Sequence, residues 1–132
     1  MEVWSLLIGI VQSTTKNAER DIADLSITAA QYLVLWEIDE HGPQRQTDLA
    51  ARLRTTEASV SQMVGRMESG GLVARHSEGR ARVVGLTDEG RSMLELARPR
   101  HAAHIARSFD RLTASQLVEL HALLRRLADP PK

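Results

Sequence analysis

One interval interrupts an otherwise helical sequence. Two short valine-rich segments, 72–76 and 82–86, flank the glycine-containing stretch SEGRA, and this pattern is typical of a β-hairpin. Paired glycines at 70 and 71 precede the hairpin and favour the end of a helix, while the run TDEG after it favours the start of another. The sequence therefore predicts a single hairpin set between helices, and no strand elsewhere.

The remaining sequence carries apolar residues at helical spacing. The expected helices cover residues 2–22, 26–43, 46–54, 56–71, 87–109 and 113–127. Ser26 or Thr28 is a candidate N-cap for the second helix, which the Gly-Pro pair at 42–43 ends. Pro99 predicts a kink in the fifth helix, and the capping-box spacing of TASQ predicts the start of the sixth.

Length and composition restrict the class of protein. A chain of 132 residues is the size of one domain, and no apolar run approaches the roughly 18 to 20 residues that span a bilayer. The apolar start VWSLLIGIV follows an acidic residue instead of a basic segment, so we interpret it as a structural helix and not as a secretory signal. The lack of cysteine excludes disulfides and thiolate zinc sites and fits a reducing compartment. We therefore expect a single-domain cytoplasmic protein that does not contact membranes.

The fourth expected helix has one apolar face and one polar face. The apolar residues that repeat at helical spacing, and are predicted to be buried, are Val60, Met63, Val64 and Met67. The opposite face carries small or hydrogen-bonding residues, namely Ala58, Ser61, Gln62, Gly65, Arg66 and Ser69, with Ser59 at its edge. Such a face is either an ordinary solvated surface or one that lies against base-pair edges, where serine and glutamine form hydrogen bonds. The order of a short helix, this helix and a hairpin is that of a winged helix-turn-helix, which favours the second interpretation.

The hairpin concentrates arginine in a chain whose formal net charge is zero. Arg75, Arg80 and Arg82 lie in or beside it, and residues 45–91 hold eight arginines against six acidic residues, a net charge of +2. In a regular strand Arg80 and Arg82 would project to the same side, where one could follow a phosphate and the other could enter a narrow minor groove. We therefore predict that the three arginines form a DNA-binding wing. The net positive charge of this region is far smaller than that of a strongly basic nucleic-acid-binding protein.

Motifs along the chain resemble those of the MarR family of bacterial transcriptional regulators. The run LTDEGR after a valine-rich strand, GLVAR before the hairpin and an acidic-x-arginine turn are similar to the family's signature. The segments ITAAQYLVLWEIDEHGP, TDLAARL and ASVSQMVGRMESGGLV resemble its second helix, the first helix of its helix-turn-helix and its recognition helix. The resemblance implies a mostly α fold with a small two- or three-stranded β-wing, a winged helix-turn-helix that is dimeric through its terminal helices.

The resemblance also implies a function and a division of the chain. Residues 1–132 would form one MarR-like domain, with 28–87 as the winged helix DNA-binding region and 1–25 and 88–132 as dimerisation helices. A homodimer would bind a pseudo-palindromic operator in duplex DNA and repress transcription under the control of a small aromatic or anionic effector. The leucine-rich stripes of the terminal helices exceed what one small core can cover, and they favour a dimer independently.

Individual DNA contacts carry over from the family by position. The matching residues are Ser59, Ser61, Gln62 and Arg66 in the recognition helix and Arg80 at the wing tip. This sequence has glutamine at 62 where arginine is frequent in the family, an acid at Glu57 and a shorter wing loop, so we expect modest operator affinity with a weak salt dependence. Arg45 stands where the family usually caps the preceding short helix with serine or threonine.

Aromatic residues offer a weaker candidate for an effector pocket. The family's effector cavity lies between the dimer helices and the winged domain, where Trp4, Tyr32 and Trp36 could line it. Packing in the core is the alternative for each of them, above all for Trp36, whose neighbours in VLWEI are apolar.

Histidines offer a weaker candidate for a metal site. His41, His101 and His104 could converge with Glu40 on a metal. Some MarR-like regulators sense zinc through carboxylate and histidine ligands near this region. Histidines three residues apart without a further fixed ligand are a weak signal. We therefore expect no metal and no cofactor.

Other classes of function compete with DNA binding. The sequence contains no Gly-x-Ser-x-Gly elbow, phosphate-binding glycine loop or His-Glu-x-x-His helix, so we predict that it is not an enzyme. The neutral charge and the acid in the recognition helix leave a winged helix used for protein contact, without operator binding, as the main alternative, beside a metal-sensing regulator. Reversal of the charges at Arg80 and Arg82 discriminates between DNA binding and protein contact.

Overall fold

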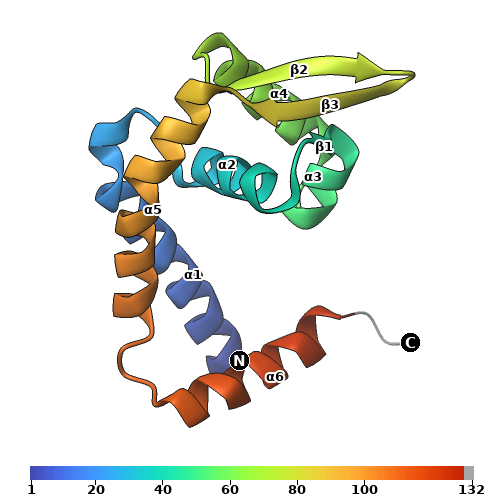
Figure 1. The fold of residues 1–132 in the computed structure, drawn as a ribbon. Helices are drawn as coiled ribbons and strands as arrows, with labels where there is room; N and C mark the ends of the chain where they lie inside the picture. The colour runs from blue at the N-terminus through green and yellow to red at the C-terminus, as the bar shows by residue number, and fades with distance from the viewer. Residues whose placement is uncertain (130–132) are drawn as a thin grey trace.

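A helical stalk carries a lobe that contains a three-stranded sheet (Figure 1). The computed structural model describes residues 1–129. Its elements in chain order are α1 (Glu2–Asp21), the 3-10 helix η1 (Ala23–Leu25), α2 (Ala29–His41), β1 (Gln44–Arg45), α3 (Gln46–Arg52), α4 (Glu57–Ser69), β2 (Val73–Glu78), β3 (Ala81–Leu86), α5 (Asp88–Ser108) and α6 (Ala114–Ala128). The lobe consists of α2, α3, α4 and the sheet, while α1 and α5 form the stalk and α6 lies at its far end (Figure 1). Within residues 1–129 no helix combines the length and the apolar character needed to cross a membrane.

The sheet is antiparallel, with the strand order β1-β3-β2. Its hairpin confirms the predicted wing, but β1 corrects the prediction that no other strand exists. β1 pairs with β3 through Gln44 opposite Val84 and Arg45 opposite Val83. A strand of two residues is too short to show an alternating pattern, so its sequence carries no signal for it. Because β1 covers only the inner part of β3, the outer part of the hairpin is a two-stranded ribbon.

The hairpin is longer, and its turn tighter, than the sequence predicted. β2 reaches Glu78 and β3 begins at Ala81, so Gly79 and Arg80 alone form the turn. The φ angle of Gly79 is +62°, as the first central residue of a type II′ turn requires. Arg80 therefore lies at the wing tip, and the prediction that Arg80 and Arg82 project from the same side of one strand is wrong.

Threonine side chains begin four of the helices. The threonines whose hydroxyl accepts a hydrogen bond from the backbone N–H three residues later are Thr28, Thr56, Thr87 and Thr113. Thr28, and not Ser26, caps α2, and the predicted capping box of Thr113 with Gln116 is present at α6. The sequence predicted a kink at Pro99, and α5 continues through this residue as one helix.

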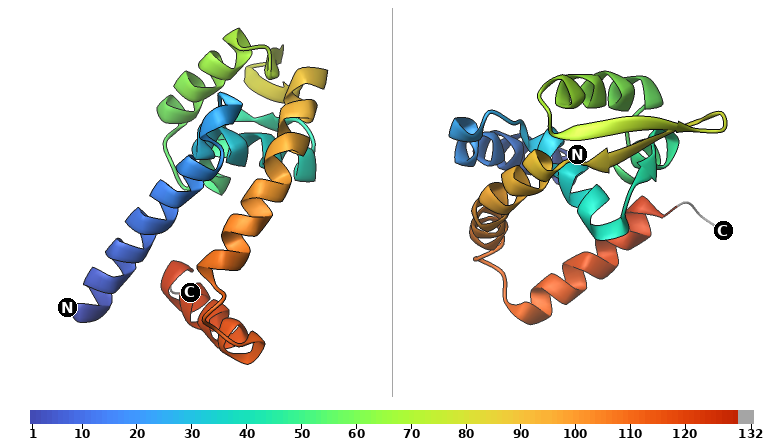
Figure 2. Two further views of the ribbon diagram at one scale, coloured as in Figure 1. Left: turned by 90° about the vertical axis from the view of Figure 1, so that its left-hand side faces the viewer. Right: turned by 45° about the horizontal axis from the view of Figure 1, so that its top comes forward.

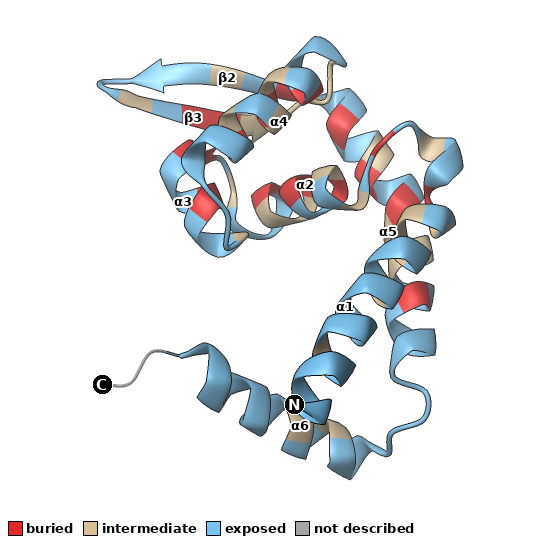
Figure 3. Ribbon diagram, turned by 180° about the vertical axis from the view of Figure 1, so that it is seen from behind, coloured by how far each residue is buried: buried red, intermediate tan, exposed pale blue. Residues whose placement is uncertain are grey.

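The hydrophobic core lies in the lobe and includes the side of α5 that faces it (Figure 3). Its largest fully buried side chains are Val34, Leu35, Leu49, Val60, Val64, Met67, Val84 and Leu94. Val60, Val64 and Met67 confirm the predicted buried face of α4, while Met63 and Trp36 are partly buried and pack against the core. This packing fixes which side of α4 is turned outward.

The stalk is packed far less tightly than the lobe. α1 and α5 contact each other near the lobe and diverge away from it (Figure 2, left). Neither α1 nor α6 contains a buried residue. Large apolar side chains of these two helices that are exposed in the single chain are Val3, Trp4, Leu6, Ile8, Ile10, Val11, Val118, Leu123, Leu124 and Leu127.

Candidate nucleic-acid interface

The outer face of α4 presents polar side chains to solvent. Ser59, Gln62 and Arg66 are exposed there, on the side of the helix away from the buried valines. The hydroxyl of Thr56 accepts the backbone N–H of Ser59 at 3.1 Å and donates to its side-chain oxygen at 2.9 Å. The Ser59 hydroxyl therefore keeps its own proton free to donate outward. A helix with this face can enter a major groove with hydrogen-bonding groups toward base edges.

Ser61 and Gly65 do not belong to the fully exposed face on which the sequence placed them. Both are half-buried. They lie on the side of α4 that packs against β2, and the carbonyl of Ser61 is 3.4 Å from a nitrogen of Arg75. Helical spacing alone put these two residues with Gln62 and Arg66, but the position of the wing decides which of them are covered.

Three arginines border a hollow between the wing and the starts of α3 and α4. Arg80 from the turn, Arg82 from β3 and Arg45 from β1 line this hollow of about 420 Å³, together with the acids Glu57 and Glu78. All three arginines are exposed. Sequence reasoning missed Arg45 as a site residue and saw only an unusual residue at a helix cap. The β1–β3 pairing, which the sequence does not reveal, brings Arg45 next to the wing.

Arg75 is placed differently from the other wing arginines. Its side chain is 16% exposed, and its guanidinium points into the lobe. Nη1 donates to Oε1 of Gln46 at 3.2 Å and to the carbonyl of Ser61 at 3.4 Å, while Nη2 lies 3.4 Å from Oε1 of Glu68. The backbone N–H of Arg75 donates to Glu68 at 3.0 Å, and this bond holds the pKa of the Glu68 carboxyl below its ordinary value. These contacts turn the guanidinium of Arg75 toward α3 and α4, whereas the sequence grouped Arg75 with the exposed arginines of the wing.

The aromatic residues proposed for an effector pocket do not meet within one chain. Tyr32 is 3% exposed and packs against the ring of His101, with 4.6 Å between the ring centroids. Burial raises the pKa of Tyr32 and lowers that of His101, so both rings are neutral near pH 7. Trp36 packs against the core, as the alternative interpretation predicted, whereas Trp4 is 63% exposed near the free end of α1.

The histidines do not converge on one ion either. His104 Nδ1 lies 3.4 Å from Asp21, and His41 lies 3.6 Å from Glu37 at the other end of α2 from Tyr32. No group of three or more histidine, aspartate or glutamate side chains suited to a metal occurs within residues 1–129. His41 therefore lies apart from the other two metal candidates, His101 and His104, whose ring centroids are 6.2 Å apart on α5.

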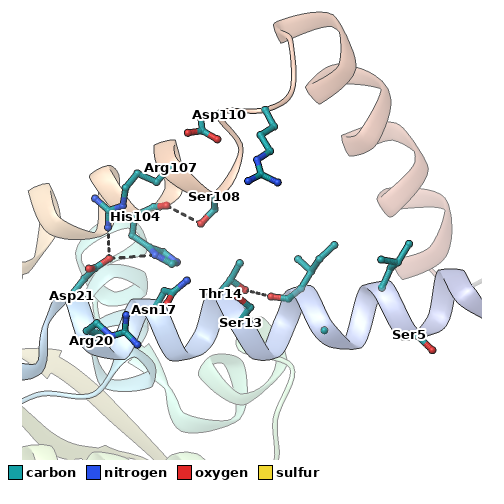
Figure 4. A pocket seen from close by; sticks show the side chains of 14 residues that line it. Ser5, Ser13, Thr14, Asn17, Arg20, Asp21, His104, Arg107, Ser108 and Asp110 are labelled. Carbon is teal, nitrogen blue, oxygen red and sulfur yellow. Dashed lines mark hydrogen bonds and ion pairs between the residues drawn. The ribbon is translucent and has the colours of Figure 1, made fainter.

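A further hollow lies between α1 and the end of α5 (Figure 4). Its volume is about 840 Å³, and it is open. Asn17, Arg20 and Arg107 contribute polar groups to its wall, where Asp21 pairs with both His104 and Arg107. The wall of this hollow is mixed, because Leu6 and Ile10 of the exposed apolar face of α1 line it together with these polar groups.

Comparison with known proteins identifies one family. The profile described as the MarR family matches residues 27–79. The HTH-type transcriptional repressor MdtR of Bacillus subtilis is 30% identical over 105 residues, which are 77% of this chain and 68% of that protein.

Solved structures resemble nearly the whole chain. The structure reported for regulation of DNA binding of Bordetella bronchiseptica BpsR by 6-hydroxynicotinic acid has a TM-score of 0.90 at 26% identity, covering 98% of this chain and 100% of that one. Sco3205 of Streptomyces coelicolor, a MarR family transcriptional regulator solved in complex with DNA, has a TM-score of 0.90 at 28% identity, covering 97% and 90%. The stalk and the lobe are therefore both part of the shared architecture.

Proposed function

Since the chain belongs to the MarR family of winged helix-turn-helix transcriptional regulators, we propose that it represses transcription by binding a pseudo-palindromic operator as a homodimer in the cytoplasm. Family membership confirms the predicted fold and the predicted class, a DNA-binding transcriptional regulator and not an enzyme.

The observation that carries the proposal is the exposed polar face of α4 beside an arginine-bearing wing. In the proposed complex α4 enters the major groove, where Gln62 and Arg66 reach base edges and Ser59 and Ser61 bond at the margins of the contact. The remaining cationic contacts are arginines that face phosphates or the minor groove, namely Arg45, Arg80 and Arg82. Glu57 and Glu78 lie among these arginines and offset part of their charge, which supports the expectation that operator affinity depends only modestly on salt concentration.

The stalk supports the proposed dimer. The apolar side chains exposed on α1 and α6 form a surface of the kind that monomeric proteins rarely leave open, and a second copy of the chain would cover it. We therefore propose 28–87 as the DNA-binding region and 1–25 and 88–132 as dimerisation helices, of which residues 130–132 lie outside the described part of the chain. Two copies of α4 would then face successive major grooves about 34 Å apart.

An effector would act on this spacing. BpsR, to which the chain is 26% identical, is described as regulated in its DNA binding by 6-hydroxynicotinic acid. We propose a small aromatic or anionic effector here as well, and the cationic side chain of Arg20, which lines the stalk hollow, suits a carboxylate. Binding between stalk helices would change the separation of the two α4 helices and so weaken operator binding.

The double charge reversal Arg80→Glu/Arg82→Glu tests the proposed function. We expect it to weaken operator binding by about 100-fold or more, because two phosphate-facing cations become anions, and to reduce the slope of log K against log salt by about 2. The operator is first selected from a random duplex library with the dimer verified by gel filtration. Affinities are then measured by fluorescence anisotropy over a range of salt concentrations.

The control for this test is Lys16→Glu, which reverses the charge of one exposed residue of α1 in the stalk, with its dimer verified by gel filtration in the same way. We expect it to leave operator affinity nearly unchanged. Unchanged affinity of the double variant would remove the wing from the DNA interface. Failure of the folded dimer to enrich any duplex would reject the proposed function and favour the protein-contact alternative.

A further inference from the structure

One stripe of α4 faces the wing and not the solvent-exposed side. Ser61, Gly65 and Glu68 stand four and three residues apart and so share one side of the helix. Arg75 of β2 lies over this stripe. A Cβ on Gly65 would lie 3.4 Å from Nη2 of Arg75, so the guanidinium rests against bare backbone at this position.

Arg75 joins three elements through polar contacts. Its guanidinium bonds to Gln46 at the start of α3 and to the carbonyl of Ser61 in α4, and it pairs with Glu68, the penultimate residue of α4. The Glu68 carboxylate accepts hydrogen bonds from both the guanidinium and the backbone N–H of Arg75, so two contacts hold the pair together. Hydrogen bonds that involve a charged partner are about twice as strong as neutral ones.

The wing depends on such an anchor because it lacks other support. β1 pairs with β3 only at Val83 and Val84, so beyond these residues toward the tip the wing is a two-stranded ribbon. An isolated two-stranded hairpin is at best marginally stable in water. Contacts at the base of the ribbon therefore decide the direction in which Arg80 and Arg82 point.

We propose that Arg75 is a positioning residue that, through Glu68, Ser61 and Gln46, fixes the angle between the wing and α4. This inference rests on the proposed function, since it assigns the orientation that lets α4 and the wing engage DNA together. It also gives Glu68 a role, because a carboxylate at the edge of a DNA-binding surface repels phosphate and would otherwise only weaken binding. Arg75 itself touches no DNA.

Substitution of Glu68 separates positioning from direct contact by the sign of its effect. If Arg75 bound phosphate directly, Glu68→Ala would free it and remove a repelling charge, and binding would tighten. If Arg75 positions the wing, Glu68→Ala weakens operator binding. We expect about a tenfold loss of affinity, or about 1.4 kcal/mol, which is within the range of interaction energies between contacting residues. The control Glu57→Ala removes the same charge from an exposed position of α4 that does not contact Arg75, and we expect equal or tighter binding.

Two further variants complete the test. Arg75→Ala and the double variant Arg75→Ala/Glu68→Ala should bind operator equally weakly, because both break the same anchor. Arg75→Lys, which keeps the charge but cannot reach several acceptors at once, should lose nearly as much affinity as Arg75→Ala. Amide hydrogen exchange of residues 76–83 in the protein without DNA should be faster in Glu68→Ala and unchanged in Glu57→Ala.

Each outcome decides the inference. Tighter operator binding by Glu68→Ala, or wild-type affinity of Arg75→Lys with an unchanged rate of wing exchange, would overturn it. If the wild-type protein binds no duplex at all, the proposed function fails. The exchange measurement still reports whether Glu68 and Arg75 hold the wing, so the two failures are distinguishable.

Discussion

Gly90→Ala is expected to destabilise the fold by about 3 kcal/mol, at the upper end of the range for forcing atoms into a packed site. A Cβ at this position would lie 1.9 Å from the carbonyl oxygen of Leu72. That oxygen cannot retreat easily, because it accepts the backbone N–H of Thr87 at 3.1 Å beside the first pair of the β2–β3 ladder. Urea unfolding followed by circular dichroism, at one fixed protein concentration, measures the loss.

The control for Gly90→Ala is Ser92→Ala, which places the same side chain on an exposed position two residues further along α5. We expect its free energy of unfolding to differ from wild type by no more than about 0.5 kcal/mol. Equal stability of Gly90→Ala and Ser92→Ala would mean that Leu72 and α5 do not approach each other closely in solution. Since this contact joins the stalk to the base of the wing, we expect Gly90→Ala to lower operator affinity as well as the free energy of unfolding.

Local signals explain which parts of the fold the sequence predicted. Thr28 and Thr113 cap helices through hydrogen bonds to residues three positions away, so the few residues that form each cap are adjacent in the sequence. Val60, Val64 and Met67 repeat with the helical period, and the core buries them together. The valines and Gly79 that predict the hairpin are likewise close together in the sequence.

Contacts between distant residues explain what the sequence did not reveal. β1 exists because Gln44 and Arg45 reach the edge of β3, about 40 positions later in the chain. Arg75 looked like its neighbours Arg80 and Arg82, but a carboxylate on α4 and an amide on α3 turn it inward. The available signal for this is the stripe of small residues beside Glu68, whose spacing on α4 does not distinguish a surface that faces DNA from one that faces the wing.

The double variant Leu123→Asp/Leu127→Asp is expected to abolish the dimer and with it operator binding. Both leucines are exposed in the single chain and lie one turn apart on α6, which packs closely on no other element of residues 1–129. Two carboxylates cannot be buried between apolar helices without a large desolvation cost. A monomer can engage only one half-site, so affinity should fall by about 100-fold or more. Sedimentation equilibrium measures the assembly, and fluorescence anisotropy measures the affinity.

The matched control is Ser115→Asp/Ala122→Asp, which adds the same two charges to exposed positions of α6 that lie roughly 100 to 120° around the helix from the two leucines. We expect this variant to remain a dimer with wild-type affinity. A dimeric Leu123→Asp/Leu127→Asp variant would show that α6 does not lie in the interface and would leave α1 as the element to test. A monomeric variant with wild-type affinity would separate DNA binding from assembly, because it would show that one copy of α4 and one wing supply the whole operator contact.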